Sequence, residues 1–283
     1  MDTVVGLGAA GCNVADGFAM YSQYRTYKID TGLSGENCYN LPKQPNHESY
    51  EKNCPDLTGF FKDVSGSVLF ALGGSGTISG AALRILHQLR HCKINILYIR
   101  PDSGLLSETR RQQERVVFGI LQEYARSGVF EKIYLVSNQS LEEILGEVPL
   151  VDYHIKLNDL VVSTLHMLNV FTNIEPVSHT FSLPVPSARV LTIGVFDPGT
   201  GVEKMFFPLD LTREKRYYYG INEKTLKTDG KLFGRIKEKV RENTVRSSYG
   251  VYKTQYDKNY GYIISYSSKV QLDIPEKKDY NKS

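Results

Sequence analysis

The stretch SVLFALGGSGTISGAALRI, residues 67–85, decides what kind of fold this chain has. It starts as an apolar run typical of a β-strand, passes through glycines and hydroxyl residues, and becomes apolar at helical spacing from about Ser79. Glycines let a backbone approach a ligand, and the free N–H groups at a helix start favour an anion. The stretch therefore predicts a phosphate cradle, with a tight turn that holds no ligand as the alternative. The residues of this candidate cradle are Gly73, Gly74, Ser75, Gly76 and Thr77.

A second glycine-rich turn lies near the N-terminus, where the expected strand TVVGLG at residues 3–8 ends. Gly6, Gly8 and Gly11 spell GxGxxG, and the next expected strand ends in Asp30, about 20 residues later. This spacing is also typical of a Rossmann dinucleotide site, in which the acid binds a ribose hydroxyl. An oxidoreductase that binds NAD(P) or FAD is therefore an alternative, although it has no use for a second glycine turn.

The two turns together resemble the nucleotide loops of the tubulin/FtsZ family. Residues 72–77 fall in register with the family signature GGGTGTG or GGTGSG, and Ile78 stands where the last glycine would be. The N-terminal turn resembles the family's GGGGGN loop, with Asn13 in the asparagine place. The resemblance extends from about Val4 to Phe171. It implies that the first two loops bind the nucleotide through Gly8, Ala9, Ala10, Gly11, Cys12, Asn13 and Asp30.

A long helix expected over residues 107–127 resembles the family's PFxFEGxxR segment. Counting back from Gly119 places Glu108 on the glutamate that contacts ribose, and Gln112 where the family has arginine. The alternative for Glu108 is compensation of the helix dipole in the first turn, and Ser107 is expected to cap that helix. The apolar residues expected along one side of it are Val116, Val117, Ile120, Leu121 and Tyr124.

Two asparagines fall on the family positions that read the base. Asn138 follows an expected strand, and Asn158 lies in a helix expected over residues 153–173. A carboxamide both donates and accepts hydrogen bonds, so two of them can match the edge of guanine. His154 falls on the aromatic residue that stacks on the purine, with Tyr153 as its rival.

Strands alternate with helices from residue 3 to 171, which predicts an α/β fold with a Rossmann-like parallel sheet covered on both faces. The ligand is expected at the carboxyl ends of the strands. The expected organisation is a GTP-binding domain at 1–152, the central helix, a smaller α+β domain at 174–273 and a polar tail at 274–283. Further expected helices cover residues 13–21, 56–62, 79–92 and 231–243.

The family's acidic NxDxxD loop, which positions the attacking water, has no counterpart after the central helix. Glu175 is the only acid available there, and a carboxylate can polarise a water molecule. The resemblance implies a GTPase, but this catalytic loop is not recognisable, so Glu175 is a weak candidate for the catalytic residue.

Composition limits the classes of function. The 283 residues carry a net charge of +3, so neither a nucleic acid nor a membrane surface is implied as a partner. The sequence contains no apolar run of about 18 residues, which argues against a membrane span. The four cysteines lack metal-type spacing and are expected to be free thiols in the cytoplasm. His87 and His91 lie four residues apart without a third ligand, so no protein-held metal is expected.

The resemblance implies a protein that binds GTP or GDP, with Mg²⁺ as a companion ion, and that forms head-to-tail filaments of itself. Its divergence and small size resemble tubulin-like proteins of phages or plasmids, which would add a host or viral cargo partner. The alternative is a nucleotide-binding module that caps or inhibits a host filament without polymerising.

Overall fold

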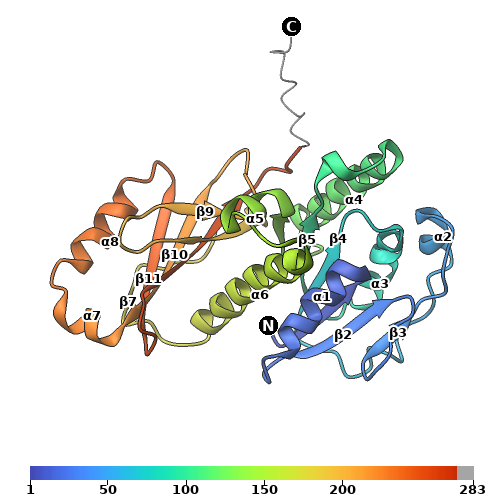
Figure 1. Cartoon of the computed structure of the whole chain (residues 1–283), viewed down its shortest axis with the longest axis horizontal. Coiled ribbons are helices and arrows are strands. Elements are labelled where there is room, and N and C mark those ends of the chain that lie inside the picture. The colour runs from blue at the N-terminus through green and yellow to red at the C-terminus, as the bar shows by residue number, and fades with distance from the viewer. Residues whose placement is uncertain (273–283) are drawn as a thin grey trace, which may run out of the picture.

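The computed structural model describes residues 1–272, so the tail predicted at 274–283 lies outside the described residues. A single 12-stranded sheet runs through the molecule in the order β3-β2-β1-β4-β5-β6-β8-β12-β10-β11-β7, and β9 pairs with β8 (Figure 1). The strands are β1 Thr3–Leu7, β2 Arg25–Asp30, β3 Cys38–Asn40, β4 Ser67–Gly73, β5 Lys93–Arg100, β6 Lys132–Ser137, β7 Ser178–His179, β8 Val190–Phe196, β9 Glu203–Met205, β10 Glu214–Asn222, β11 Arg246–Thr254 and β12 Tyr260–Ser267.

The first half of the sheet is parallel, as the sequence predicted. Strands β1 to β6 pair in parallel, and their apolar residues enter two cores on opposite faces. Helices α1 (Gly8–Ala19) and α6 (Tyr153–Thr172) cover one face, whereas α3 (Ala82–Gln88) and α4 (Glu108–Arg126) cover the other. Burial on both faces explains why β4 and β5 read as nearly continuous apolar runs.

The second half of the sheet is mostly antiparallel and joins the first half directly. Strand β8 pairs in parallel with β6, and β12 pairs antiparallel with both β8 and β10. Helix α6 packs over this half too, because Phe171 stacks on Tyr252 with ring centroids 4.4 Å apart. Helices α7 (Glu223–Thr228) and α8 (Leu232–Arg241) connect β10 to its parallel neighbour β11. The predicted α/β class with a long central helix is therefore confirmed, while the proposed domain boundaries stay a prediction.

Several predicted helix boundaries were wrong. The helix expected from residue 13 begins at Gly8, so most of the N-terminal turn is helical. The helix expected over 79–92 is a 3₁₀ segment, η1 (Thr77–Ala81), followed by the short α3. Residues 56–62 form no helix, and the nearby helix is α2 (His47–Lys52), which is capped by Asn46. The C-terminal half contains α7 as well as the expected α8.

Only part of the apolar side of α4 is covered. Val117 and Leu121 are buried, as expected for a helix that packs on a sheet. Val116, Ile120 and Tyr124 are exposed, although the Tyr124 ring stacks on Phe130 with centroids 5.7 Å apart. Helical periodicity identifies an apolar side, but it does not tell what covers it.

Candidate functional site

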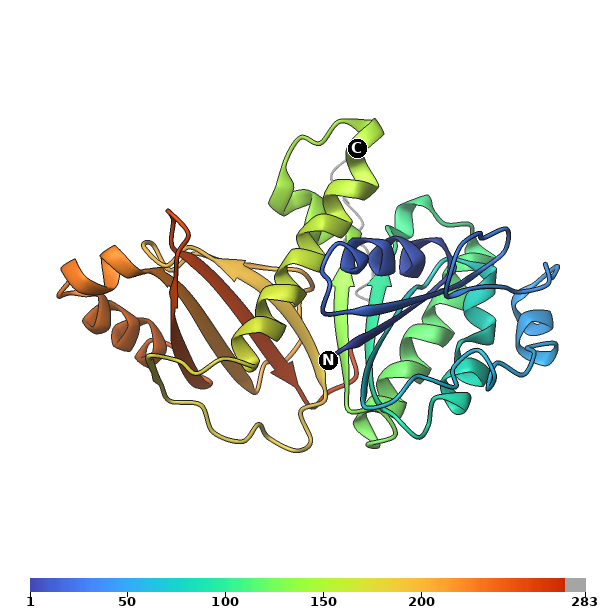
Figure 2. The ribbon, with the colours of Figure 1, turned by 90° about the horizontal axis from the view of Figure 1, so that it is seen from below.

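The site predicted from sequence lies along one edge of the sheet. Parallel strands β1, β2, β4, β5 and β6 end there, so the loops that follow them come together. Figure 2 shows this carboxyl edge at the top, with the start of α6 rising beside it. The nucleotide residues predicted from Gly8 to Asn158 therefore all belong to segments at or next to one edge.

The two glycine turns touch each other. A Cβ added to Gly73 would lie 2.9 Å from the Cβ of Ala10, and one added to Gly8 would lie 2.7 Å from Ile78 Cγ2. Gly8 also has a φ of +69°, which favours glycine. The sequence predicted that the two loops bind the same ligand. They are about sixty residues apart in the chain, and the structure places them side by side.

The N-terminal turn forms the first turn of α1. No side chain caps this helix, so its first N–H groups are free of side-chain acceptors and suited to an anion. Ala9 and Asn13 are exposed, but Cys12 is buried, and its thiol lies 3.7 Å from the carbonyl oxygen of Gly6. Burial raises the pKa of the Cys12 thiol to about 12. Cys12 therefore supports the turn from inside, and its side chain does not face the site.

The turn after β4 is held from two sides. The Gly74 N–H donates to the Ile99 carbonyl oxygen at 3.1 Å. On the other side, the Ser79 hydroxyl donates to the Gly76 carbonyl oxygen at 2.6 Å, and His47 Nε2 lies 3.2 Å from the same hydroxyl. Burial lowers the pKa of the His47 imidazole, which favours its neutral form. The hydroxyls of Ser75 and Thr77 make no hydrogen bond within residues 1–272, so they are free to meet a ligand.

A buried polar network that sequence reasoning missed lies under Gly74. The Tyr98 hydroxyl donates to Glu114 Oε1 at 2.9 Å, and Arg100 Nε lies 3.5 Å from the same oxygen. Glu114 is only 4% exposed, and burial raises the pKa of its carboxyl while Arg100 opposes that shift. The available signal was an acid on the buried side of α4, one turn before Phe118.

The loop after β5 is fixed by Arg111. Its Nε donates to the carbonyl oxygens of Ser103 at 2.9 Å and Leu106 at 3.2 Å. Glu108 is exposed at the start of α4, and Gln112 Nε2 donates to its Oε1 at 3.3 Å. Ser107 occupies the N-cap position but makes no capping hydrogen bond, contrary to the expectation.

The two predicted base-reading amides lie near the starts of α5 (Asn138–Leu145) and α6. Asn138 begins α5, and Asn158 lies in the second turn of α6. Both are half-buried, and neither side chain is hydrogen-bonded to another described residue. His154 is exposed with its ring edge-on to Tyr153 at 5.1 Å, while the Tyr153 hydroxyl donates to Glu142 at 3.2 Å. Tyr153 is thus anchored to α5, which leaves His154 the freer ring.

Of two other predicted residues, Asp30 lies at the carboxyl edge, whereas Glu175 lies apart from it. Asp30 ends β2, and its carboxylate accepts the Thr31 N–H at 2.8 Å. Glu175 follows the far end of α6, a helix of 20 residues that spans about 30 Å. It cannot reach the carboxyl-edge loops of its own chain. Among residues 1–272, no three His, Cys, Asp or Glu side chains gather as a metal site.

No protein-family model matches the sequence, and no curated protein matches it. The structure, however, closely matches several solved ones. The GDP-bound monomer of CetZ1 from Haloferax volcanii superposes with a TM-score of 0.72 over 96% of each chain, at 14% identity. The FtsZ dimer of M. jannaschii gives a TM-score of 0.68 over 94% of this chain and 87% of that chain, at 12% identity. This chain has the tubulin/FtsZ fold.

A third solved structure extends the likeness. The GTPγS-form protofilament of Bacillus thuringiensis serovar israelensis TubZ gives a TM-score of 0.67 at 16% identity, over 95% of this chain and 87% of that chain. The tubulin/FtsZ fold therefore covers nearly the whole chain, beyond Phe171, where the sequence resemblance faded.

No helix among residues 1–272 is long and apolar enough to cross a membrane.

Proposed function

We propose that this chain binds a guanine nucleotide at its carboxyl edge and assembles head-to-tail into filaments. The observation that carries the proposal is the contact between the two glycine turns at the carboxyl edge of a tubulin/FtsZ fold. The uncapped start of α1 and the free hydroxyls of Ser75 and Thr77 suit phosphate oxygens. GTP or GDP would bind there, and Mg²⁺ would accompany the phosphates.

The free amides of Asn138 and Asn158 support guanine as the base. Each amide offers a donor and an acceptor, as the edge of guanine requires. A half-buried amide without a protein partner is best satisfied by a ligand or by water. His154 supplies the exposed ring for stacking, and Glu108 supplies an acceptor for a ribose hydroxyl.

Exposed apolar residues at both ends of α6 support head-to-tail assembly. The carboxyl-edge patch comprises Leu105, Leu150, Val151 and Ile155; the linker patch comprises Ile174, Val177 and Leu183. In Figure 2 the segment with Leu150 and Val151 stands out at the top, and the linker after α6 runs along the bottom. Two different patches at opposite ends favour a heterologous contact, which produces an open filament.

Hydrolysis in this filament would depend on the linker patch of the next copy. Glu175 precedes Val177 there, so a head-to-tail contact would bring it toward the nucleotide of its neighbour. A single carboxylate without a supporting acid favours slow turnover. A cytoplasmic location and a cargo or host partner belong to the same proposal and rest on the resemblance.

The first test is to denature freshly purified protein, identify the released nucleotide by chromatography, and pellet the native chain with GTP at rising concentration. We expect guanine nucleotide and a concentration-dependent pellet. The pellet should disappear in Leu150→Asp, while nucleotide remains bound. Met20→Asp is the matched control, since Met20 is exposed and lies outside both patches.

The outcomes separate the alternatives. Bound guanine nucleotide without any pellet at high concentration would favour the capping module, for which the missing acidic loop is the motivating observation. Bound NAD(P) or FAD would support the oxidoreductase instead. A chain that contains and binds no guanine nucleotide would contradict the proposal.

A further inference from the structure

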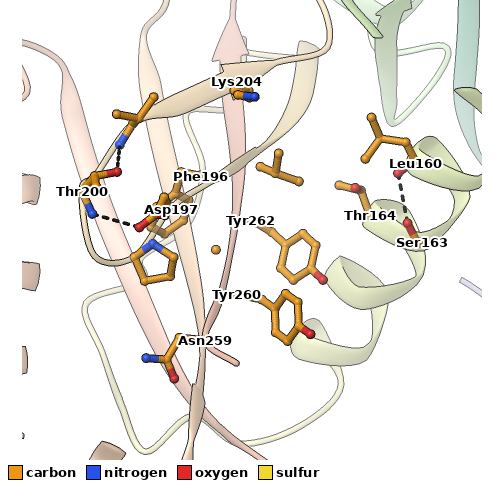
Figure 3. A pocket seen from close by; sticks show the side chains of 14 residues that line it. Leu160, Ser163, Thr164, Phe196, Asp197, Thr200, Lys204, Asn259, Tyr260 and Tyr262 are labelled. Atoms are coloured by element: carbon orange, nitrogen blue, oxygen red, sulfur yellow. Dashed lines mark hydrogen bonds between the residues drawn. The ribbon is translucent and has the colours of Figure 1, made fainter. Parts of the chain in front are cut away.

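A groove on the side of the molecule, apart from the pocket in Figure 3, adjoins the proposed site through Gln112 and extends away from it. It lies between α2, η1, α3 and α4, with a volume of about 420 Å³. Its apolar lining includes the exposed residues Val116 and Ile120 and the buried residues Val117 and Leu121. Val116 and Ile120 are the two of these side chains that the described residues leave exposed. An open, largely apolar groove of this size can hold an apolar side chain of a partner.

The ionised side chains that line the groove are acidic. They are Glu48 and Glu51, and no lysine or arginine lines it. Arg84 lies just outside, with its Nε 3.9 Å from Glu51 Oε1, and both side chains are more than half exposed. Such an exposed pair contributes little. The groove therefore suits an apolar side chain accompanied by a positive charge.

The opposite end of the molecule carries such a feature on α8. Phe233 is 46% exposed, and Lys237 Nζ lies 4.2 Å from the centre of its ring. Within residues 1–272, neither Lys237 nor the N-cap residue Lys231 has an ion pair. The Phe233 ring also meets the Tyr249 ring edge-on, with centroids 6.3 Å apart. Helix α8 thus presents an aromatic side chain flanked by unpaired lysines.

We propose that α8 of one copy docks in the α2/α4 groove of a second copy, with Phe233 in the groove and Lys237 at its acidic rim. Figure 1 places α8 and α2 at opposite ends of the longest axis, so the contact is heterologous and would join copies side by side in open rows. Figure 2 shows α8 and α2 at the two sides of the molecule, away from the carboxyl edge at the top and the linker at the bottom. The contact is therefore distinct from the head-to-tail contact.

Apolar area and opposite charges favour α8 of a second copy as the segment that binds in the groove. A phenyl ring buries a large apolar area and supplies a major part of interface energy. Opposite charges at the rim add specificity and raise the association rate. Both complementary parts belong to this chain, and within residues 1–272 each keeps an exposed apolar side chain, because Phe233 is 46% and Val116 57% exposed.

The test uses full-length chain without nucleotide in a Leu150→Asp background, which removes the proposed head-to-tail contact. Sedimentation velocity over a concentration series should show association of this parent chain. Phe233→Asp and Val116→Asp should each weaken association at least tenfold. Phe233→Asp removes the ring that enters the groove, and Val116→Asp puts a charge into the groove itself. Val129→Asp is the matched control, an exposed apolar residue outside both surfaces, and should associate like the parent.

A mixture of the Phe233→Asp and Val116→Asp chains tests whether α8 of one copy binds the groove of another. The Val116→Asp chain keeps α8 and the Phe233→Asp chain keeps the groove, so an equimolar mixture should form one-to-one dimers and nothing larger. Lys237→Glu should weaken association, and Glu51→Lys in the other chain should restore it. A monomeric parent, unaffected variants or a mixture without dimers would each overturn the proposal. None of these outcomes depends on nucleotide binding.

Discussion

The two glycine turns at the carboxyl edge look alike in sequence but use their glycines differently. In the first turn, a Cβ on Gly6 or Gly11 would lie 2.2 Å from a backbone carbonyl oxygen. In the second, a Cβ on Gly74 would lie 2.0 Å from the Tyr98 hydroxyl, a side-chain atom, and one on Gly76 would meet nothing closer than 3.7 Å. The glycines therefore range from those that the fold requires to one that the fold does not need.

This difference changes how a glycine motif should be interpreted. A glycine whose Cβ would strike backbone is there for close packing of helix on strand, whether or not a ligand binds. A glycine with open space and ordinary backbone dihedrals has no such reason. Gly76 has φ −83° and ψ 137°, which any residue adopts. Only glycines of this second kind point to a ligand, and the following substitutions separate the two kinds.

The largest effect is expected for Gly11→Ala. The new methyl group would meet the Ala71 carbonyl oxygen in β4, so α1 would have to move away from the sheet. We expect a loss of about 4 kcal/mol in the free energy of unfolding, at the upper end for single substitutions. Urea denaturation measures it, and nucleotide is left out so that only the fold contributes. A loss below about 1 kcal/mol would mean that α1 and β4 are not in such close contact.

The sequence predicted the strands better than the contacts between elements. The apolar runs of β4 and β5 identify buried parallel strands, because both faces of the sheet are covered. The early start of α1 was missed because Gly8 to Gly11 read as a loop, yet an uncapped helix begins there. Local patterns do not reveal the Tyr98–Glu114 bond, which joins residues 16 apart on a strand and a helix.

In the candidate site, too, the elements were easier to predict than the contacts between them. Its loops were predictable, because they follow strands whose order is fixed by the parallel sheet. The buried orientation of Cys12 and the packing role of Gly74 were not, because both depend on which neighbouring strand lies beneath them. The nucleotide roles of these residues stay predictions.

An intermediate effect is expected for Gly74→Ala. The methyl group would displace the Tyr98 hydroxyl from Glu114, at a cost of about 1–3 kcal/mol in the free energy of unfolding. Tyr98→Phe removes the clashing oxygen but also the hydrogen bond to a buried carboxylate, which costs about 1–3 kcal/mol. The double variant should therefore be less destabilised than the sum of the two single variants, by about 0.5–3 kcal/mol. Additive losses in a double-mutant cycle would contradict this packing role.

The smallest effect on stability, and the most informative, is expected for Gly76→Ala. Its backbone already suits alanine, so the loss of freedom in the unfolded chain should raise stability by about 0.4–1 kcal/mol. Space for a methyl group exists in the protein, whereas a phosphate bound against this turn would meet it. We therefore expect unchanged or higher thermal stability together with weaker GTP binding, measured by calorimetry on nucleotide-free chain. Gly119→Ala, a glycine with open space on the far side of α4, is the matched control and should leave affinity unchanged. Equal GTP affinity in both variants would place the phosphates away from this turn, although the fold would be the same.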